Sequence, residues 1–406
     1  MAPTILANDL AIGAVPTMGT YVPPTPPAPP IFPLTDATIQ QAVDDALAWD
    51  PVTGNVTGWP TIDNWDVSPV TTMRFLFQNK TLFNGDISTW NTSNVTDMGF
   101  MFNGAENFNG DLSSWDTSNV TNMGYMFQKA FNFNTDISSW NVSNVLYMIN
   151  MFFEATSFNN GNQSLNTWTT SSLLGMAGIF KKASSFNQPI DNWDVSGVTD
   201  FGGVFAAATV FNQPLNNWDV SNATRLAQMF SSAPAFNQPL DNWDVGNVTN
   251  MRGMFESGGN SMQFNQDISG WNVVNVQEFQ YMFNVDTLNG GSAVFNQPIG
   301  SWNTGSATDM KYMFSGCTAF NQPIGSWNTS GVTDMKFMFY QNTGFNQDIS
   351  GWNTSNNVFF WSMFNGATAF NQDLSGWNTS SATSCSDFDL GATSWVLPKP
   401  TFAFPC

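Results

Sequence analysis

The sequence predicts an α/β repeat solenoid of about 13 coils of 25 residues. The first observation behind this prediction is the spacing of thirteen tryptophans, because nine of the twelve intervals between them are 25 residues and the others are 28, 28 and 31. The second is that apolar residues recur at fixed offsets after each tryptophan. One copy alone buries too little apolar surface to offset the entropy of ordering it, so neighbouring copies must stack. The tryptophans are Trp65, Trp90, Trp115, Trp140, Trp168, Trp193, Trp218, Trp243, Trp271, Trp302, Trp327, Trp352 and Trp377.

The copy that begins at Trp90 indicates one short helix and one strand in each coil. Its apolar residues are spaced by 3, 3 and 1 positions, as on one stripe of a helix: Val95, Met98, Met101 and Phe102. Gly104 is placed to end this helix. Residues 108–115, FNGDLSSW, are about as long as one strand per coil requires. Stacked coils are expected to align the Trp, Phe and Met side chains in continuous ladders.

The most regular position in the repeats is polar. In each of twelve copies a phenylalanine is followed directly by an asparagine. An asparagine at one turn of every coil can bond backbone groups of the adjacent coils and so satisfy donors and acceptors that the bend leaves open. We therefore interpret this column as a structural ladder. Its members are Asn84, Asn109, Asn134, Asn159, Asn187, Asn212, Asn237, Asn265, Asn296, Asn321, Asn346 and Asn371.

The segments WNTSNVTDMGFMF, FNQDISGW and FNQPIGSW resemble the BspA-like leucine-rich repeats of bacterial surface proteins, some protists, and marine viruses and phages. The resemblance covers about residues 61–395. It implies a leucine-rich-repeat-like solenoid with one parallel sheet and short helices on the opposite side. It also implies a role in adhesion or surface interaction, and it provides no catalytic residues to transfer.

Four regions follow from composition and pattern. Residues 1–33 form a Pro-rich N-terminal arm, expected to be extended and to serve either as a linker or as a segment that lies along a partner. Residues 34–60 form a capping helix and a turn, and residues 61–395 form the solenoid. Residues 396–406 form a C-terminal tail whose prolines prevent a further strand from adding to the open edge.

The capping helix is predicted over residues 37–49, ATIQQAVDDALAW, with Thr35 or Asp36 as its N-cap. Its apolar residues fall on one face, which is expected to cover the open end of the ladder. These residues are Ile39, Ala42, Val43, Ala46 and Leu47.

Charge and composition exclude several functions. The chain has 30 acidic and 10 basic residues, no histidine and a formal net charge of −20. Such a field repels phosphate backbones and anionic lipid, so we expect neither nucleic-acid binding nor membrane insertion. Without histidine there is no His-based triad or His metal ligand, and phosphate-binding glycine motifs are absent from the sequence, so no enzymatic activity and no cofactor are expected. The N-terminus lacks the basic region of a secretory signal.

Coils eight and nine carry insertions that are expected to protrude side by side. They supply the candidate binding residues, which are Asn260, Gln263, Asp286, Thr287 and Asn289. A second candidate is a column of aspartates in successive coils, which serves either as a solvated polar edge or as a Ca²⁺ site with oxygen ligands. This column contains Asp86, Asp111 and Asp136.

The three cysteines give no firm disulfide framework. Cys317 occupies a small apolar position and is expected to be a core thiol. Cys385 and Cys406 either pair with each other or remain reduced, because the sequence leaves the redox compartment open.

Together these features favour a non-enzymatic surface interaction or structural protein. The first hypothesis is a virion or phage surface component, located at the virion surface and attached through its N-terminal arm to a capsid, tail or other assembly. Such a component would contact a host-surface receptor or glycan. The alternative is an extracellular, cell-surface adhesin of a bacterium or protist.

Overall fold

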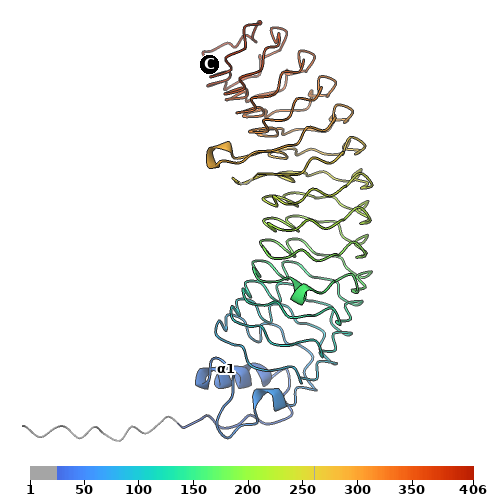
Figure 1. Ribbon diagram of the computed structural model, residues 1–406, viewed down its shortest axis with the longest axis vertical. Coiled ribbons are helices and arrows are strands. Elements are labelled where there is room, and N and C mark those ends of the chain that lie inside the picture. Colours follow the sequence, from blue (N-terminus) through green and yellow to red (C-terminus); the bar gives the residue numbers. More distant parts are fainter. Residues whose placement is uncertain (1–24, 260) are drawn as a thin grey trace, which may run out of the picture.

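The computed structural model describes residues 25–259 and 261–406, and there the chain winds into coils stacked in a curved column (Figure 1). The helical elements of this part are α1 (Ile39–Trp49) and three 3-10 helices, η1 (Ile62–Asn64), η2 (Asn160–Asn162) and η3 (Thr287–Asn289). Helix α1 lies at the N-terminal end of the column, and η3 projects from its concave side (Figure 1). The repeats themselves consist of turns and irregular segments.

The strand predicted over residues 108–115, and the parallel sheet that the family resemblance implies, are not formed in the described part of the chain. Residues 108–115 contain no strand. Neighbouring coils instead meet through isolated parallel bridges between equivalent residues, such as Thr72 with Asp97 and Phe359 with Ser384. These bridge residues lie seven positions after their repeat tryptophan. The coils are therefore in parallel register, but each contributes bridges rather than a strand.

The prediction of a short helix in each repeat is wrong, because the backbone N–H groups of these segments do not form the hydrogen bonds of a helix. In the second coil every second N–H closes a turn onto the carbonyl three residues earlier, and the N–H groups between them donate to the next coil. The turn bonds are Met101 to Met98, Asn103 to Phe100 and Ala105 to Phe102, at 3.0–3.2 Å. The bonds to the next coil are Met98 to Asn122, Phe100 to Gly124, Phe102 to Met126 and Gly104 to Gln128, at 2.7–2.9 Å. The apolar spacing of three thus arises from consecutive β-turns.

These turns require a left-handed backbone at two positions in most coils. Phe100 has φ of 60° and Gly104 has φ of 72°, at offsets of ten and fourteen residues from Trp90. Gly104, expected to end a helix, is instead the third residue of a turn, where positive φ is required. A left-handed conformation is unfavourable for residues with a side chain. It recurs here because, in coils one to twelve, the N–H of each such residue bonds to the next coil.

The repeat tryptophans lie in the core. All thirteen are only 2–5% exposed, and their indole N–H groups also find partners. Trp218 Nε1 donates to the carbonyl of Ile190, 28 residues earlier, at 2.9 Å, and an equivalent bond recurs at every repeat tryptophan from Trp90 to Trp377. Phenylalanine rings stack between coils, with 5.4 Å between the ring centroids of Phe102 and Phe127. Each coil thus packs mainly against its two neighbours.

The asparagine column forms a continuous chain of hydrogen bonds through the solenoid. The side-chain oxygen of Asn84 accepts the backbone N–H of Asn109 at 2.9 Å. Each later asparagine does the same for the next coil, and Asn371 accepts the N–H groups of Val396 and Leu397. A side chain therefore replaces the backbone carbonyl that a regular ladder would use at this edge.

The N-terminal region closes the first coil. Helix α1 begins at Ile39 after Thr38, so neither Thr35 nor Asp36 is its N-cap residue, and the five predicted apolar residues of its stripe are buried. Asp36 instead reaches the first coil, where it accepts the N–H groups of Thr71 and Thr72 and the hydroxyl of Thr71. In the following coils the N–H equivalent to that of Thr71 donates to a carbonyl of the preceding coil, as the N–H of Thr96 does to Thr71. Asp36 therefore substitutes for a coil that is absent.

Part of the Pro-rich arm also covers this end. The Pro27 carbonyl accepts the indole N–H of Trp59 at 2.8 Å, and the ring of Phe32 lies 6.1 Å from that of Trp65. Residues 25–33 thus lie against their own solenoid, whereas residues 1–24 of the predicted arm lie outside the described residues.

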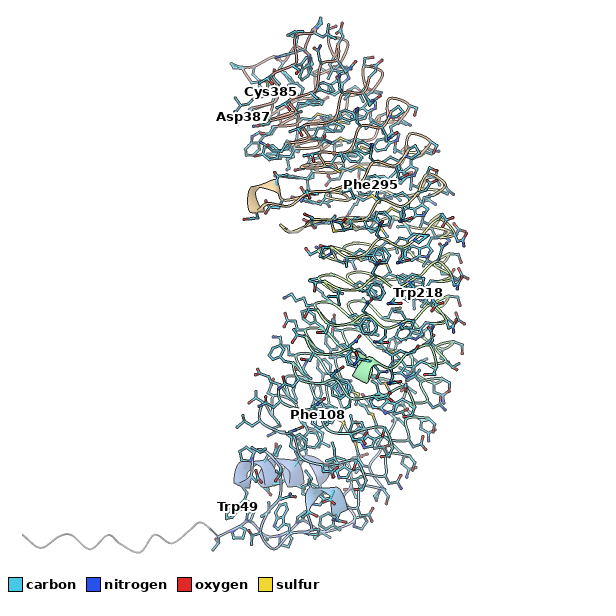
Figure 2. The ribbon with its side chains drawn as sticks, in the orientation of Figure 1. Trp49, Phe108, Trp218, Phe295, Cys385 and Asp387 are labelled. Atoms are coloured by element: carbon cyan, nitrogen blue, oxygen red, sulfur yellow. A yellow bond between two sulfur atoms is a disulfide. The ribbon has the colours of Figure 1, made fainter. Side chains whose placement is uncertain are left out.

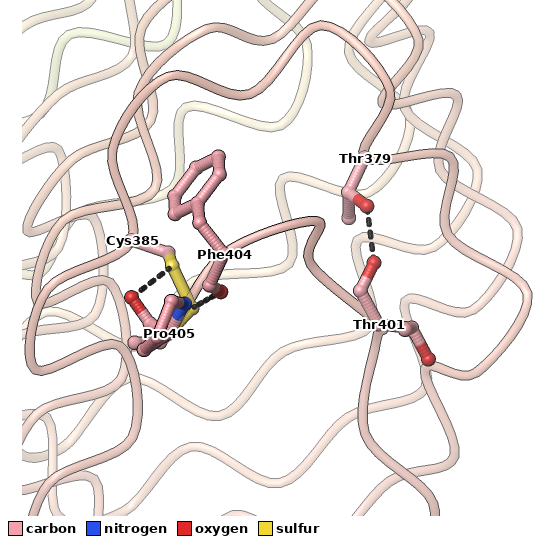
Figure 3. The surroundings of a disulfide bond; sticks show 6 residues. Thr379, Cys385, Thr401, Phe404 and Pro405 are labelled. Atoms are coloured by element: carbon pink, nitrogen blue, oxygen red, sulfur yellow. Dashed lines mark hydrogen bonds between the residues drawn. A yellow bond between two sulfur atoms is a disulfide. The ribbon is translucent and has the colours of Figure 1, made fainter.

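The C-terminal tail is fixed to the last coil. Cys385 and Cys406 form a disulfide with a Cα–Cα distance of 5.0 Å, and the hydroxyl of Thr379 donates to the Thr401 carbonyl (Figure 3). Cys317 is a buried thiol, and burial raises its pKa to about 12. The tail therefore closes the stack, and the disulfide joins two residues that sequence alone left open.

Candidate binding face

One side of every coil is built by the segment that carries the bridges. We call the residues at offsets 7–17 after each repeat tryptophan the bridge segments. Helix α1 lies beside the first of them, since Gln40 donates to the Leu76 carbonyl and Lys80 pairs with Asp44. Like α1 and η3, Asp387 of the last bridge segment lies on the concave side of the column (Figure 2). The bridge segments therefore follow the concave side.

The bridge segments hold almost all of the basic and tyrosine side chains. Nine of the ten basic residues lie there, namely Arg74, Lys80, Lys129, Lys181, Lys182, Arg225, Arg252, Lys311 and Lys336. Five of the six tyrosines do too, namely Tyr125, Tyr147, Tyr281, Tyr312 and Tyr340. The rest of the repeat region, residues 61–395, contains fourteen aspartates and no basic residue. Basic and tyrosine residues are thus concentrated on one side of the coil.

The aspartates outside the bridge segments stabilise turns of their own coils. Asp86, Asp111 and Asp136 each accept the backbone N–H of the serine two residues later, at 2.9–3.0 Å. For Asp86 these bonds from Ser88 lower the carboxyl pKa. Among the described residues no group of three or more acidic or cysteine side chains could hold a metal ion. The structure therefore gives this column a role in the turns and does not gather it into a Ca²⁺ site.

Aromatic rings that are exposed or half-buried stack in two columns at offset ten. Near the N-terminus Phe100 stacks on Tyr125 with 4.4 Å between their ring centroids, and the centroid of Phe75 lies 4.9 Å from that of Phe100. Near the C-terminus Tyr312 stacks on Tyr281 at 4.7 Å and on Phe337 at 4.4 Å. In the five coils between these columns the offset-ten residues are Asn150, Gly178, Gly203, Gln228 and Gly253.

A groove of about 390 Å³ lies beside the second aromatic column. Its lining combines aromatic rings with hydroxyl, amide and carboxyl groups. It includes Glu256, Ser257, Gly258, Tyr281, Asn284, Val285, Asp286, Thr287, Tyr312, Ser315, Phe337 and Tyr340. A volume above 300 Å³ is within the range of small-molecule sites.

The structure brings together only part of the predicted site. Asp286 and Thr287 line the groove, and Asn289 is bound to Asp286 in the same turn. Gln263 is exposed but does not line the groove, and its N–H donates to the Pro234 carbonyl at 3.3 Å. Asn260 lies outside the described residues.

Sequence reasoning missed the aromatic residues of the groove. Tyr281, Tyr312 and Phe337 each lie ten residues after their repeat tryptophan, and this shared position was the signal that could have identified them. It went unused because that offset was assigned to a helix rather than to an exposed turn.

The insertions build one wall of the groove. In most coils the residue at offset fourteen is left-handed. In coils eight and nine the residues at this offset, Ser257 and Val285, instead form a bridge with each other, and Met262 forms a second bridge with Ala293. The turn that follows is closed by Asp286, which accepts the backbone and side-chain N–H groups of Asn289. Extra bridges thus attach the inserted segment to the preceding coil.

The groove is polar, yet its carboxyl groups are already engaged. Burial raises the pKa of Glu256, whose carboxyl also interacts with Arg252 and Asn284. Burial raises the pKa of Tyr312 to about 12, and that of Tyr281 is raised for the same reason. The tyrosine hydroxyls therefore remain protonated donors well above neutral pH.

No helix in the described residues is long and apolar enough to cross a membrane.

A family model described as Mycoplasma protein of unknown function, DUF285, matches residues 52–164, 159–263, 218–292, 259–327 and 285–395. These overlapping matches run from the first coil to the last, as expected for a repeat array. None of the curated proteins compared with the chain matches it.

Proposed function

The chain belongs to the family described as Mycoplasma protein of unknown function, DUF285, and we propose that it is a non-enzymatic surface interaction protein. The observation that carries this proposal is the segregation of side chains around the coil. Tyrosine and arginine are enriched where proteins bind partners, whereas uniformly acidic surface favours solubility. The bridge segments hold the former and the rest of the repeats holds fourteen aspartates. The concave side is therefore the proposed binding face.

The finer fold and family assignment is also a proposal. The motif WNTSNVTDMGFMF supports a BspA-like repeat, and the parallel register of the bridges is compatible with a solenoid related to leucine-rich repeats. The turn-built coils depart from the sheet and helices of that architecture. An experimental structure of several coils tests this assignment, since continuous strands or helices there would contradict the turns described above.

For location we propose a virion or phage surface component that decorates the particle or contacts its host. The resemblance to marine viral repeats and the acidic composition support this location. The proposed attachment to the particle uses the N-terminal arm. Residues 25–33 of that arm lie against the first coil, and residues 1–24 lie outside the described residues. The alternative is a cell-surface adhesin of a bacterium or protist, which the implied adhesion role supports.

Fractionation of the source organism separates the two locations. Mass spectrometry of purified particles is expected to detect the chain as a stoichiometric component. Recovery only from the cell envelope would support the adhesin instead, and recovery only from the soluble cell interior would contradict both locations.

The binding face is tested by paired variants of the full chain. Phe100→Ser with Tyr125→Ser is expected to weaken retention on the particle or cell, because it removes two stacked, half-buried rings of the proposed binding face. The control Asp111→Ser lies outside the bridge segments and is expected to leave retention unchanged. Equal loss in both variants would argue against a one-sided binding face.

A further inference from the structure

We propose that the groove beside coils eight to eleven binds a neutral carbohydrate unit. This inference rests on the proposed function and adds a ligand class and a location to it. The groove is the place where an aromatic column meets an inserted wall, because Tyr281, Tyr312 and Phe337 face the turn that contains Asp286 and Thr287. The first aromatic column, at Phe100 and Tyr125, has no insertion beside it.

The hydroxyl groups of this groove are available to a ligand. Within the described residues the hydroxyls of Tyr281, Tyr312 and Tyr340 make no hydrogen bond. Three such donors along one groove suit a ligand that carries several hydroxyl acceptors. The stacking of Tyr312 between Tyr281 and Phe337 fixes the ring orientation before a ligand binds.

The charges around the groove disfavour an ionic ligand. No lysine or arginine is among the described residues that line it, and the nearby Lys311 is paired with Asp309 at 2.9 Å, so the groove offers an anion no free counter-charge there. A cation would need an exposed carboxylate. However, Asp286 holds the Asn289 turn, and Glu256 interacts with Arg252 and Asn284. An uncharged ligand is thus the best match.

A carbohydrate has the two features that match this groove, namely apolar C–H groups and several hydroxyls. Its C–H groups pack against the edges of the stacked rings, and its hydroxyls bond to tyrosine, threonine and amide groups. A volume of about 390 Å³ is near the lower end of the range for small-molecule sites, which indicates one or two sugar units rather than a long chain.

The test uses the full chain and a panel of neutral sugars, namely hexoses, N-acetylhexosamines and their disaccharides. Saturation-transfer NMR finds binders and titration calorimetry gives their affinity. Tyr312→Phe keeps the ring stack and removes one hydroxyl, so it is expected to weaken binding about fivefold. Thr287→Ala tests the opposite wall with a similar expected loss. The matched control is Tyr147→Phe, the same change at an exposed tyrosine that belongs neither to the groove nor to the two aromatic columns.

Saturable binding that weakens in the groove variants and not in Tyr147→Phe supports the proposal. Three results overturn it: no saturable binding of any neutral sugar, equal binding by all variants, or a preference for lysine- or arginine-rich peptides. Failure here is distinguishable from failure of the proposed function. If the chain still binds particles or cells through its bridge segments, only the carbohydrate assignment falls.

Discussion

The side-chain oxygen of Asn212 accepts the backbone N–H of Asn237 at 3.0 Å, which joins coils six and seven through a side chain instead of a carbonyl. The same asparagine also receives the side-chain amide of Gln238, on both its backbone and side-chain oxygens. One residue thus satisfies three donor–acceptor contacts from the next coil. Because the bond from the asparagine side chain to the next coil recurs from Asn84 to Asn371, the column works as a backbone extension of the solenoid.

Replacing Asn212 by alanine is expected to destabilise the protein by about 1–3 kcal/mol, because the part-buried N–H of Asn237 loses its acceptor. Urea unfolding followed by tryptophan fluorescence measures this change. The control is Asn217→Ala, which alters an exposed asparagine of the same coil and is expected to change stability by less than about 0.5 kcal/mol. Equal effects of the two substitutions would contradict a specific ladder bond.

Asp36→Ala is expected to loosen the N-terminal end of the column. It removes the acceptor for the N–H groups of Thr71 and Thr72 and for the Thr71 hydroxyl. Since a solenoid couples mainly neighbouring coils, hydrogen exchange should rise in α1 and the first coils and stay unchanged near Trp352. Uniform acceleration along the chain would show that the carboxyl acts in some other way.

Stability is expected to fall as the pH is lowered below about 4. In seven turns the serine two residues after an aspartate lowers the carboxyl pKa through its hydroxyl and backbone N–H. These aspartates are Asp66, Asp86, Asp116, Asp219, Asp267, Asp348 and Asp373. A lowered folded-state pKa gives stability above the unfolded-state pKa, and this stability is lost as pH falls through the folded-state value. Burial raises the pKa of Glu256 and Asp334, which act in the opposite sense but are fewer.

Thermal melts between pH 7 and pH 2.5 measure this dependence. The matched variant is Asp116→Asn with Asp219→Asn, because Asn91 and Asn328 make the same turn bond in other coils. The double variant is expected to fold normally and to lose less stability in acid. A melting temperature that rises on acidification would reverse the assigned sign.

Removal of the disulfide is expected to destabilise the C-terminal end by about 3 kcal/mol, since it closes a chain segment of 21 residues. Cys385→Ser with Cys406→Ser tests this by chemical denaturation and by proteolysis of the tail. Cys317 remains as the buried thiol, and its raised pKa should keep it unreactive toward a thiol reagent in the folded protein. Rapid labelling of native wild-type protein would contradict both assignments.

A peptide of one coil, residues 90–114, is expected to be unstructured by circular dichroism. Its apolar side chains are buried by the coils on both sides, as the stacking of Phe102 on Phe77 and Phe127 shows. A fragment of several central coils should fold but melt at lower temperature, because it exposes two uncapped ends. A stably folded single coil would refute the dependence of each coil on its neighbours.

Much of the core could be predicted from sequence because burial follows spacing. The tryptophans, the Phe column and the apolar face of α1 are buried at the expected positions. The asparagine at each repeat was recognisable as a ladder candidate because an amide can serve a backbone donor wherever the chain bends. The candidate binding residues were only partly located, since insertion length indicates a protrusion and not the side chains that face it.

The local conformation could not be predicted, because two structures share the same apolar spacing. Val95, Met98 and Met101 suit a helix, yet their segment is a series of turns in which alternate N–H groups bond to the next coil. A single sequence window does not contain the acceptors that decide between these states. The left-handed residues Phe100 and Tyr125 depend on the same inter-coil bonds.

By itself the sequence determined the period, the stacking and the identity of the buried rings, because these follow from apolar residues repeated at a fixed interval. Only the tertiary structure decided that the coils are turns, that Asp36 and the disulfide-bonded tail close the ends, and that Tyr281, Tyr312 and the inserted turn meet in one groove. The physical reason is that these features depend on hydrogen bonds and contacts between residues at least 20 positions apart.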